Sequence, residues 1–215
     1  MKKYLPKLRF MPTNQLKNYS GLGAILLIFT VSFQCVALED KSFFSKHHDF
    51  TVKTILKNLD NPWGLAFINP NLALITQKNG VILQANLKEN TVSKLTNPIE
   101  ISKCGQGGLM DIALHPDFKD NQFVYFSYSK RRAGNCGTEV ARAQFVENKL
   151  ENAETIFIAN EKNKDPRHFG SRLVFLADKS LVVTLGDRGH RPNGQDINTH
   201  PGSIIRVKDD GSFAK

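Results

Sequence analysis

From Thr51 onward, hydrophobic residues occur in short runs that are separated by Gly, Pro, Asn and Asp. Short runs rich in β-branched and aromatic residues are typical of strands, and no stretch keeps a helical period over a useful length. We therefore predict an all-β chain. The predicted strands cover residues 51–56, 63–68, 72–76, 80–86, 91–96, 108–114, 123–129, 139–146, 172–177, 181–186 and 203–207.

Three of these runs open in a similar way, at Gly64, Gly108 and Ser171, and a turn links each to a second, more apolar run. The openings lie 44 and 63 residues apart. Repeats of roughly 40 to 50 residues that hold about four strands are typical of β-propeller blades, and the longer interval predicts an inserted loop. A β-sandwich is the alternative, but it does not predict a repeated unit. We expect residues 130–137 to form the tip of a long loop between strands.

The N-terminal segment has a different character. Five basic residues and no acidic ones accompany an apolar run over residues 21–33, which is the pattern of an export signal. The run is short for a membrane span, and small residues at 35–37 offer a cleavage site. We predict a signal peptide over 1–37, a mature domain over 38–215 and a periplasmic or secreted location. An uncleaved membrane anchor is the alternative.

The charge balance changes once this segment is set aside. The whole chain has a formal net charge of +9, whereas residues 38–215 hold 24 basic and 20 acidic residues, a net charge of +4. Apart from the short basic run at 130–132, no basic cluster with interleaved aromatic residues remains. The sequence therefore does not indicate a nucleic-acid partner.

The cysteines indicate a disulfide. Removal of the signal peptide would also remove Cys35 and leave Cys104 and Cys136, in an oxidising compartment. Neither cysteine lies in a CxxC motif or near a histidine partner, so the spacing does not favour a metal site. Two free thiols are the alternative.

The segment DPRHFGSRLVF, residues 165–175, places His168 between a turn and an apolar run. A neutral imidazole can remove a hydroxyl proton, but it needs an orienting partner. Asp187 in TLGDRG ends the next predicted strand, so a hairpin would bring it beside His168. The alternative is that both are ordinary loop residues. Gln106, flanked by glycines in CGQGGL, is a candidate ligand contact, although the loop lacks the spacing of a nucleotide-binding motif.

Five segments together resemble a known family. NPWGLAF, GQGGLMDIALHPDF, HFGSRLVF, LVVTLGDRG and GQDINTHPGSIIRVKDDGS occur in the order and rough spacing of the soluble pyrroloquinoline quinone (PQQ)-dependent sugar dehydrogenases, the glucose/sorbosone dehydrogenase family. The sequence is most similar to the periplasmic aldose sugar dehydrogenase branch, from about Leu59 to Phe213. The resemblance implies a six-bladed β-propeller, incomplete here at about three blades, with PQQ at one end of its channel and held partly by Ca²⁺.

The resemblance also implies roles for single residues. His168 would act as the base on the anomeric hydroxyl of an aldose, oxidised to a lactone, while hydride passes to the quinone. Asp187 would orient that base, Gln106 would lie at the sugar and cofactor site, and Arg172 matches the family's motif arginine at the cofactor. Arg167 stands where glucose-oxidising relatives tend to carry an acidic residue, so a narrow glucose preference is not predicted. The electron acceptor is not indicated.

Members of the family continue for about three further blades after the position that matches Lys215. The calcium ligands, the arginine that polarises the quinone and the basic residues that bind the PQQ carboxylates are expected there. We therefore assign no metal ligand to this chain and expect it to be inactive alone. The alternative is a non-catalytic exported propeller that binds carbohydrate or a protein partner.

Overall fold

A computed structural model describes residues 41–160 and 164–214. These residues belong to one compact unit, Asp40–Lys215. The predicted signal peptide over 1–37, with Cys35 and its cleavage site, lies outside the described residues.

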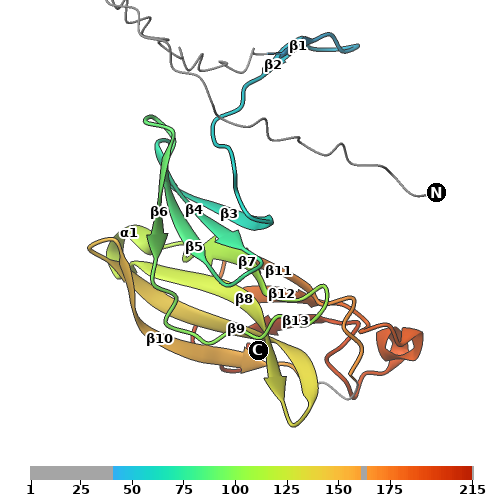
Figure 1. Cartoon of the computed structure of the whole chain (residues 1–215). Helices are drawn as coiled ribbons and strands as arrows, with labels where there is room; N and C mark the ends of the chain where they lie inside the picture. Colours follow the sequence, from blue (N-terminus) through green and yellow to red (C-terminus); the bar gives the residue numbers. More distant parts are fainter. Residues whose placement is uncertain (1–40, 161–163, 215) are drawn as a thin grey trace, which may run out of the picture. The chain divides into compact units, whose positions relative to one another are not determined.

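Three antiparallel sheets follow one another along the chain (Figure 1). In each sheet, strands that are consecutive in sequence pair with each other. The first sheet contains β3 (Pro62–Asn69), β4 (Leu72–Gln77), β5 (Ile82–Asn86) and β6 (Thr91–Leu95). The second contains β7 (Leu109–Leu114), β8 (Phe123–Arg132), β9 (Asn135–Val146) and β10 (Lys149–Ile158). The third contains β11 (Gly170–Phe175), β12 (Leu181–Leu185) and β13 (Ile204–Val207).

Neighbouring sheets meet through their first strands. β3 contacts β7, and β7 contacts β11. Sheets arranged as meanders that pack side by side around their first strands are propeller blades. The predicted openings at Gly64, Gly108 and Ser171 lie at the starts of these three strands, so the sequence repeat corresponds to the blade.

The second blade is covered on both faces because the side chains of β8 alternate between two cores. Phe126 belongs to the core shared with Leu74 of the first blade, and its neighbour Tyr125 belongs to the core shared with Leu173 of the third. All four side chains are buried. Burying one large apolar side chain contributes roughly 1.5 to 3 kcal/mol, so these two cores hold the blades together.

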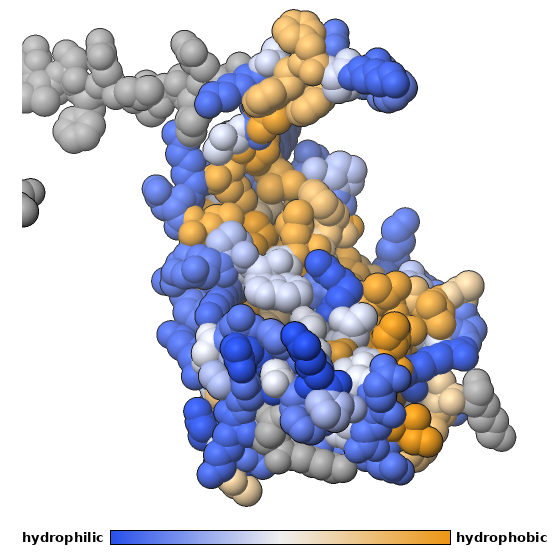
Figure 2. Space-filling model, turned by 90° about the vertical axis from the view of Figure 1, so that its right-hand side faces the viewer, coloured by the Kyte–Doolittle hydropathy of each residue, from blue (hydrophilic) through white to orange (hydrophobic). Residues whose placement is uncertain are grey.

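The outer faces of the first and third blades remain open. Leu65 and Phe67 of β3 are exposed, Phe67 by 57%, and so are Val174 of β11 and Ile204 of β13, the latter by 73%. Apolar areas are visible on the surface in Figure 2. In a propeller, such faces are covered by the adjacent blades.

Four short elements complete the described structure. They are the hairpin of β1 (Lys41–Phe43) and β2 (Phe50–Val52), the helix α1 (Phe118–Asn121) and the 3₁₀ segment η1 (Arg191–Gln195). Of the strand predicted over 51–56, only residues 51 and 52 lie in a strand, as the end of β2. Residues 53–56 are not in a sheet. α1 was not predicted, because a single turn leaves no helical period in the sequence.

Two further expectations were wrong. Residues 130–137 do not form a long loop, because β8 and β9 extend to Arg132 and Asn135 and leave a two-residue turn. Ala133 and Gly134 both have positive φ, 46° and 82°, as the two central residues of a type I′ hairpin turn require. The strand β10 was missed because its side chains are mostly exposed at the sheet edge and show no apolar alternation.

Candidate active site

His168 and Asp187 lie at the same end of the third blade. His168 precedes β11 and Asp187 follows β12, and Gly170 pairs with Leu185 in the hairpin between them. The imidazole Nδ1 is 2.7 Å from Oδ1 of Asp187. The structure therefore brings the two predicted residues into hydrogen-bond contact.

The charge on Asp187 decides which ring nitrogen of His168 is free. The hydrogen bond from His168 is the main cause that lowers the pKa of the Asp187 carboxyl, and the N–H of Gly189 also donates to it at 2.9 Å. An ionised carboxylate only accepts hydrogen bonds, so Nδ1 donates and Nε2 of the neutral ring keeps its lone pair. The His168 side chain is 50% exposed, and no described residue is bonded to Nε2. This nitrogen can accept a proton from a ligand.

The backbone of His168 is held in an uncommon conformation. Its φ is 54°, in the left-handed region that few residues other than glycine adopt. Its N–H donates to Oε1 of Gln106 at 2.8 Å, and a Cβ at Gly186 would lie 2.0 Å from its carbonyl oxygen. A glycine is therefore required at position 186 for the strand to pass this close to the base.

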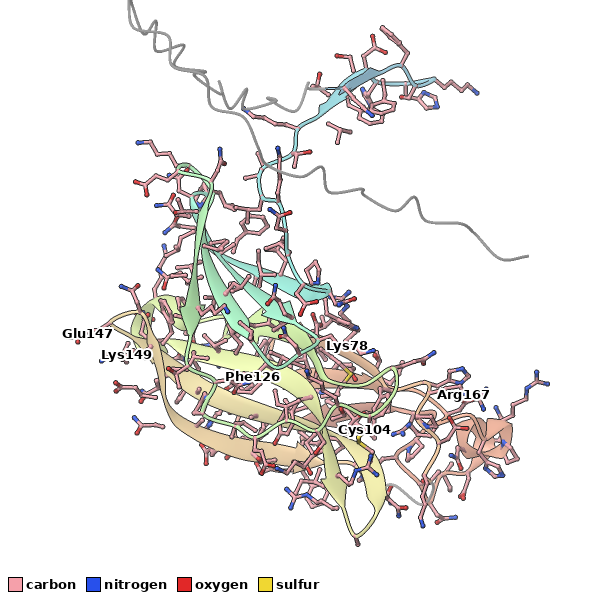
Figure 3. All side chains as sticks on the ribbon, in the orientation of Figure 1. Lys78, Cys104, Phe126, Glu147, Lys149 and Arg167 are labelled. Atoms are coloured by element: carbon pink, nitrogen blue, oxygen red, sulfur yellow. A yellow bond between two sulfur atoms is a disulfide. The ribbon has the colours of Figure 1, made fainter. Side chains whose placement is uncertain are left out.

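Gln106 is held by the same loops. Its N–H donates to the carbonyl of Pro166 at 2.9 Å, and its side-chain oxygen is used by His168. The side-chain nitrogen makes no hydrogen bond to the described residues and is free to donate to a ligand. A disulfide between Cys104 and Cys136 ties this loop to β9. Figure 3 shows Cys104 and Arg167 toward the same end of the blades, opposite Glu147 and Lys149.

Arg172 lies on β11, after Gly170 and therefore farther along the strand from His168. Its Nη1 donates to the buried Asp111 of β7 at 2.9 Å, and its guanidinium lies 5.4 Å from the ring centre of Trp63 on β3. Most of the Arg172 side chain is exposed. Among the described residues, it is not hydrogen-bonded to His168, Asp187 or Gln106. The first strands of all three blades thus meet at this arginine. It lies next to the hydrogen-bonded pair of His168 and Asp187 and is not part of it.

Sequence reasoning missed three residues of this region. Trp63 and Asp111 were seen only as parts of strands, and Arg188 only as part of a turn. Arg188 is nevertheless 1% exposed and contacts several site loops. Its place directly after Asp187 is the only signal in the sequence, and a polar turn after a strand does not distinguish a buried arginine from an exposed one.

The described residues contain neither a metal-binding cluster nor a membrane-spanning helix. No group of three or more His, Cys, Asp or Glu side chains within 41–160 and 164–214 could hold a metal ion. In the same ranges, no helix is long and apolar enough to cross a membrane.

Comparison with known proteins adds the family context. A model of the family described as glucose / sorbosone dehydrogenase matches residues 59–215. The aldose sugar dehydrogenase of Escherichia coli is 32% identical over 166 residues, 75% of this chain and 45% of that protein, and its apo structure superposes with a TM-score of 0.71. The quinoprotein glucose dehydrogenase B of Acinetobacter calcoaceticus is 28% identical, over 95% of this chain and 49% of that protein.

A PQQ-bound aldose sugar dehydrogenase from Streptomyces coelicolor has a TM-score of 0.68 and 28% identity, covering 76% of this chain and 49% of that one. The chain spans about half the length of the curated relatives it matches. Its three blades are accordingly an incomplete six-bladed propeller.

Proposed function

The chain belongs to the glucose/sorbosone dehydrogenase family, and from this we propose that it is the N-terminal portion of a PQQ-dependent aldose dehydrogenase that oxidises the anomeric hydroxyl of aldoses to lactones. The observation that supports the proposal most directly is the 2.7 Å hydrogen bond between His168 and Asp187, with Nε2 of His168 open to a ligand. We infer an exported protein from the N-terminal segment, with a periplasmic or secreted location.

The chemistry of this chain is proton removal. Nε2 of His168 takes the proton of the anomeric hydroxyl while the hydrogen on the same carbon leaves as hydride, so the aldose loses two electrons and becomes a lactone. PQQ, when bound, supplies the two-electron acceptor. Asp187 keeps the ring in the tautomer that exposes Nε2 and stabilises the imidazolium that forms. A general base of this kind contributes roughly 10²- to 10⁴-fold to the rate.

The residues present fit an anionic, planar cofactor in their donor chemistry. The free amide nitrogen of Gln106 and the exposed N–H groups of Arg172 are donors, and PQQ carries carboxylates and carbonyl oxygens that accept. Guanidinium groups bind carboxylates well because their donors are parallel and charged. We assign these two residues to the cofactor and assign no calcium ligand to the described residues.

A chimera tests the proposal. Residues 41–215 are joined to the C-terminal half of the Escherichia coli relative, reconstituted with PQQ and Ca²⁺, and assayed with several aldoses and an artificial electron acceptor. We expect PQQ-dependent oxidation of aldoses, with no narrow preference for glucose because Arg167 precedes the base. The present chain, assayed in the same way, is expected to show no turnover.

A chimera that folds and binds both PQQ and sugar without oxidising it would contradict the proposal and favour a binding propeller. Robust turnover by the present chain alone would show that no further blades are needed.

A further inference from the structure

A buried cation lies at the centre of the site loops. Arg188 is the largest fully buried side chain of the described residues. Its Nε donates to the carbonyl of Arg167 at 2.9 Å, its Nη1 to the carbonyl of Cys136 at 2.7 Å, and its Nη2 to the carbonyl of Asp165. Burying a guanidinium is costly unless its donors are satisfied, so the surrounding carbonyls are arranged around this residue.

The same guanidinium also packs on an aromatic ring. Its central carbon lies 3.7 Å from the ring centre of Phe169, the residue that follows His168. A cation over an aromatic face is attracted by the ring, and more strongly where water is excluded. Arg188 therefore contacts both neighbours of His168 in the chain. It bonds to the carbonyl of Arg167 before it and packs on the ring of Phe169 after it.

The backbone of Arg188 completes the arrangement. It follows Asp187 directly and adopts a φ of 55°, in the left-handed region. Because the Asp187 carboxylate is one residue away, any shift of Arg188 also moves the group that orients the base. The third carbonyl, that of Cys136, extends the connection to β9 and to the disulfide with Cys104.

From these contacts we propose that Arg188 is a positioning residue, which holds the loop of His168 against the loop of Asp187 and both against the disulfide-bonded end of β9. Its importance for catalysis rests on the function proposed above, but the arrangement itself does not. Lysine cannot take this role, because its compact ammonium lacks the planar fork that reaches three carbonyls from one position.

Proton NMR of the present chain tests the proposal without cofactor or substrate. A proton held between Nδ1 of His168 and Asp187 gives a downfield resonance, which is assigned by its loss in His168→Ala. We expect Arg188→Met and Arg188→Lys to lose this resonance or to broaden it through at least tenfold faster exchange with water. The titration midpoint of the Asp187 carboxyl should rise toward its ordinary range in both variants, because the bond that lowers it is weakened.

Arg206→Met is the matched control, since Arg206 lies on β13 and bonds to Ser180 and Asp178 at the other end of the same blade. It should leave the resonance unchanged. A folded Arg188→Met or Arg188→Lys variant with the wild-type resonance and carboxyl midpoint would overturn the proposal.

Phe169→Leu keeps the experiment decisive if both arginine variants fail to fold. It removes the ring beneath the guanidinium and retains an apolar side chain, and we expect at least twofold faster exchange of the same proton. Unchanged exchange in this variant would count against the proposal. Loss of the resonance in the variants, together with a chimera that folds and binds PQQ and sugar but does not oxidise it, would refute the proposed function and leave the positioning role intact.

Discussion

Two histidines with aspartates nearby lie at opposite ends of the blades and differ in which ring nitrogen is free. At His115, Nδ1 accepts from the N–H of Asp117 at 3.0 Å and from the amide of Asn121 at 2.7 Å, so the neutral ring carries its proton on Nε2. At His168, Nδ1 donates to Asp187, and Nε2 keeps its lone pair. The two rings are therefore held in opposite tautomers.

The surroundings of the two rings differ as well. The His115 side chain is 4% exposed and its ring centre lies 5.3 Å from that of Phe175, at the end of β11 far from His168. Burial is the main cause that lowers the pKa of His115, against the opposing charges of Asp209 and Asp117. A nearby carboxylate alone thus does not make a base. The ring also needs Nε2 free of its proton and open to a ligand.

The largest expected effect separates the two histidines by activity. In the chimera, His168→Ala should lower kcat by about a hundredfold to ten-thousandfold, on the order expected for loss of a general base. His115→Asn should change kcat by less than about threefold, because an asparagine oxygen can still accept from the N–H of Asp117. Steady-state kinetics at saturating aldose measure both. A loss below a hundredfold in His168→Ala would reduce that residue to a structural role.

The second effect concerns the disulfide, which lies at the His168 end only. Replacing Cys104 and Cys136 together by alanine should lower the free energy of unfolding by roughly 3 to 4 kcal/mol in the chain-entropy model. Urea unfolding measures the loss. Native-state hydrogen exchange should show faster opening of the loops around His168 than of the His115 turn, and equal changes at both ends would argue against a local role.

The third effect concerns stability, for which His115 should matter more than His168, the reverse of the order expected for activity. His115→Ala should lower the free energy of unfolding by about 2 kcal/mol, because it leaves a cavity beside Phe175 and an unpaired N–H at Asp117. His168→Ala should change it by less than about 0.5 kcal/mol, as is usual at exposed positions. Urea unfolding at pH 7 compares them, and equal losses would contradict the assignment of one ring to packing and the other to chemistry.

The smallest effect is a pH dependence. The pKa of His115 is lowered in the folded state, so below its ordinary value of about 6.5 the unfolded chain binds the proton first. Its contribution to stability is complete above that pH and declines as the pH falls toward the folded pKa. Urea midpoints between pH 7.5 and 5 should therefore fall more in the wild type than in His115→Asn. Parallel curves would show that this ring does not contribute.

The sequence alone determined the local features. Short apolar runs bounded by Gly, Pro, Asn and Asp predict strands because a half-buried strand needs an apolar face and its ends need turn residues. Most of the strands that pair in the three sheets were predicted to within a few residues. The hairpin between His168 and Asp187 also follows from local pattern, since its two strands are adjacent in sequence and bring their outer ends together.

Only the tertiary structure decided which side chains meet between blades and loops. Gln106 reaches the N–H of His168 across 62 residues, and Arg172 reaches Asp111 across 61, through the packing of separate sheets. Arg188 is buried because carbonyls from two other segments surround it. Likewise, the opposite tautomers of the two histidines depend on which donor or acceptor the folded chain places at Nδ1. Local sequence sets the backbone preference of a segment, whereas burial and protonation depend on neighbours that only the assembled blades bring into contact.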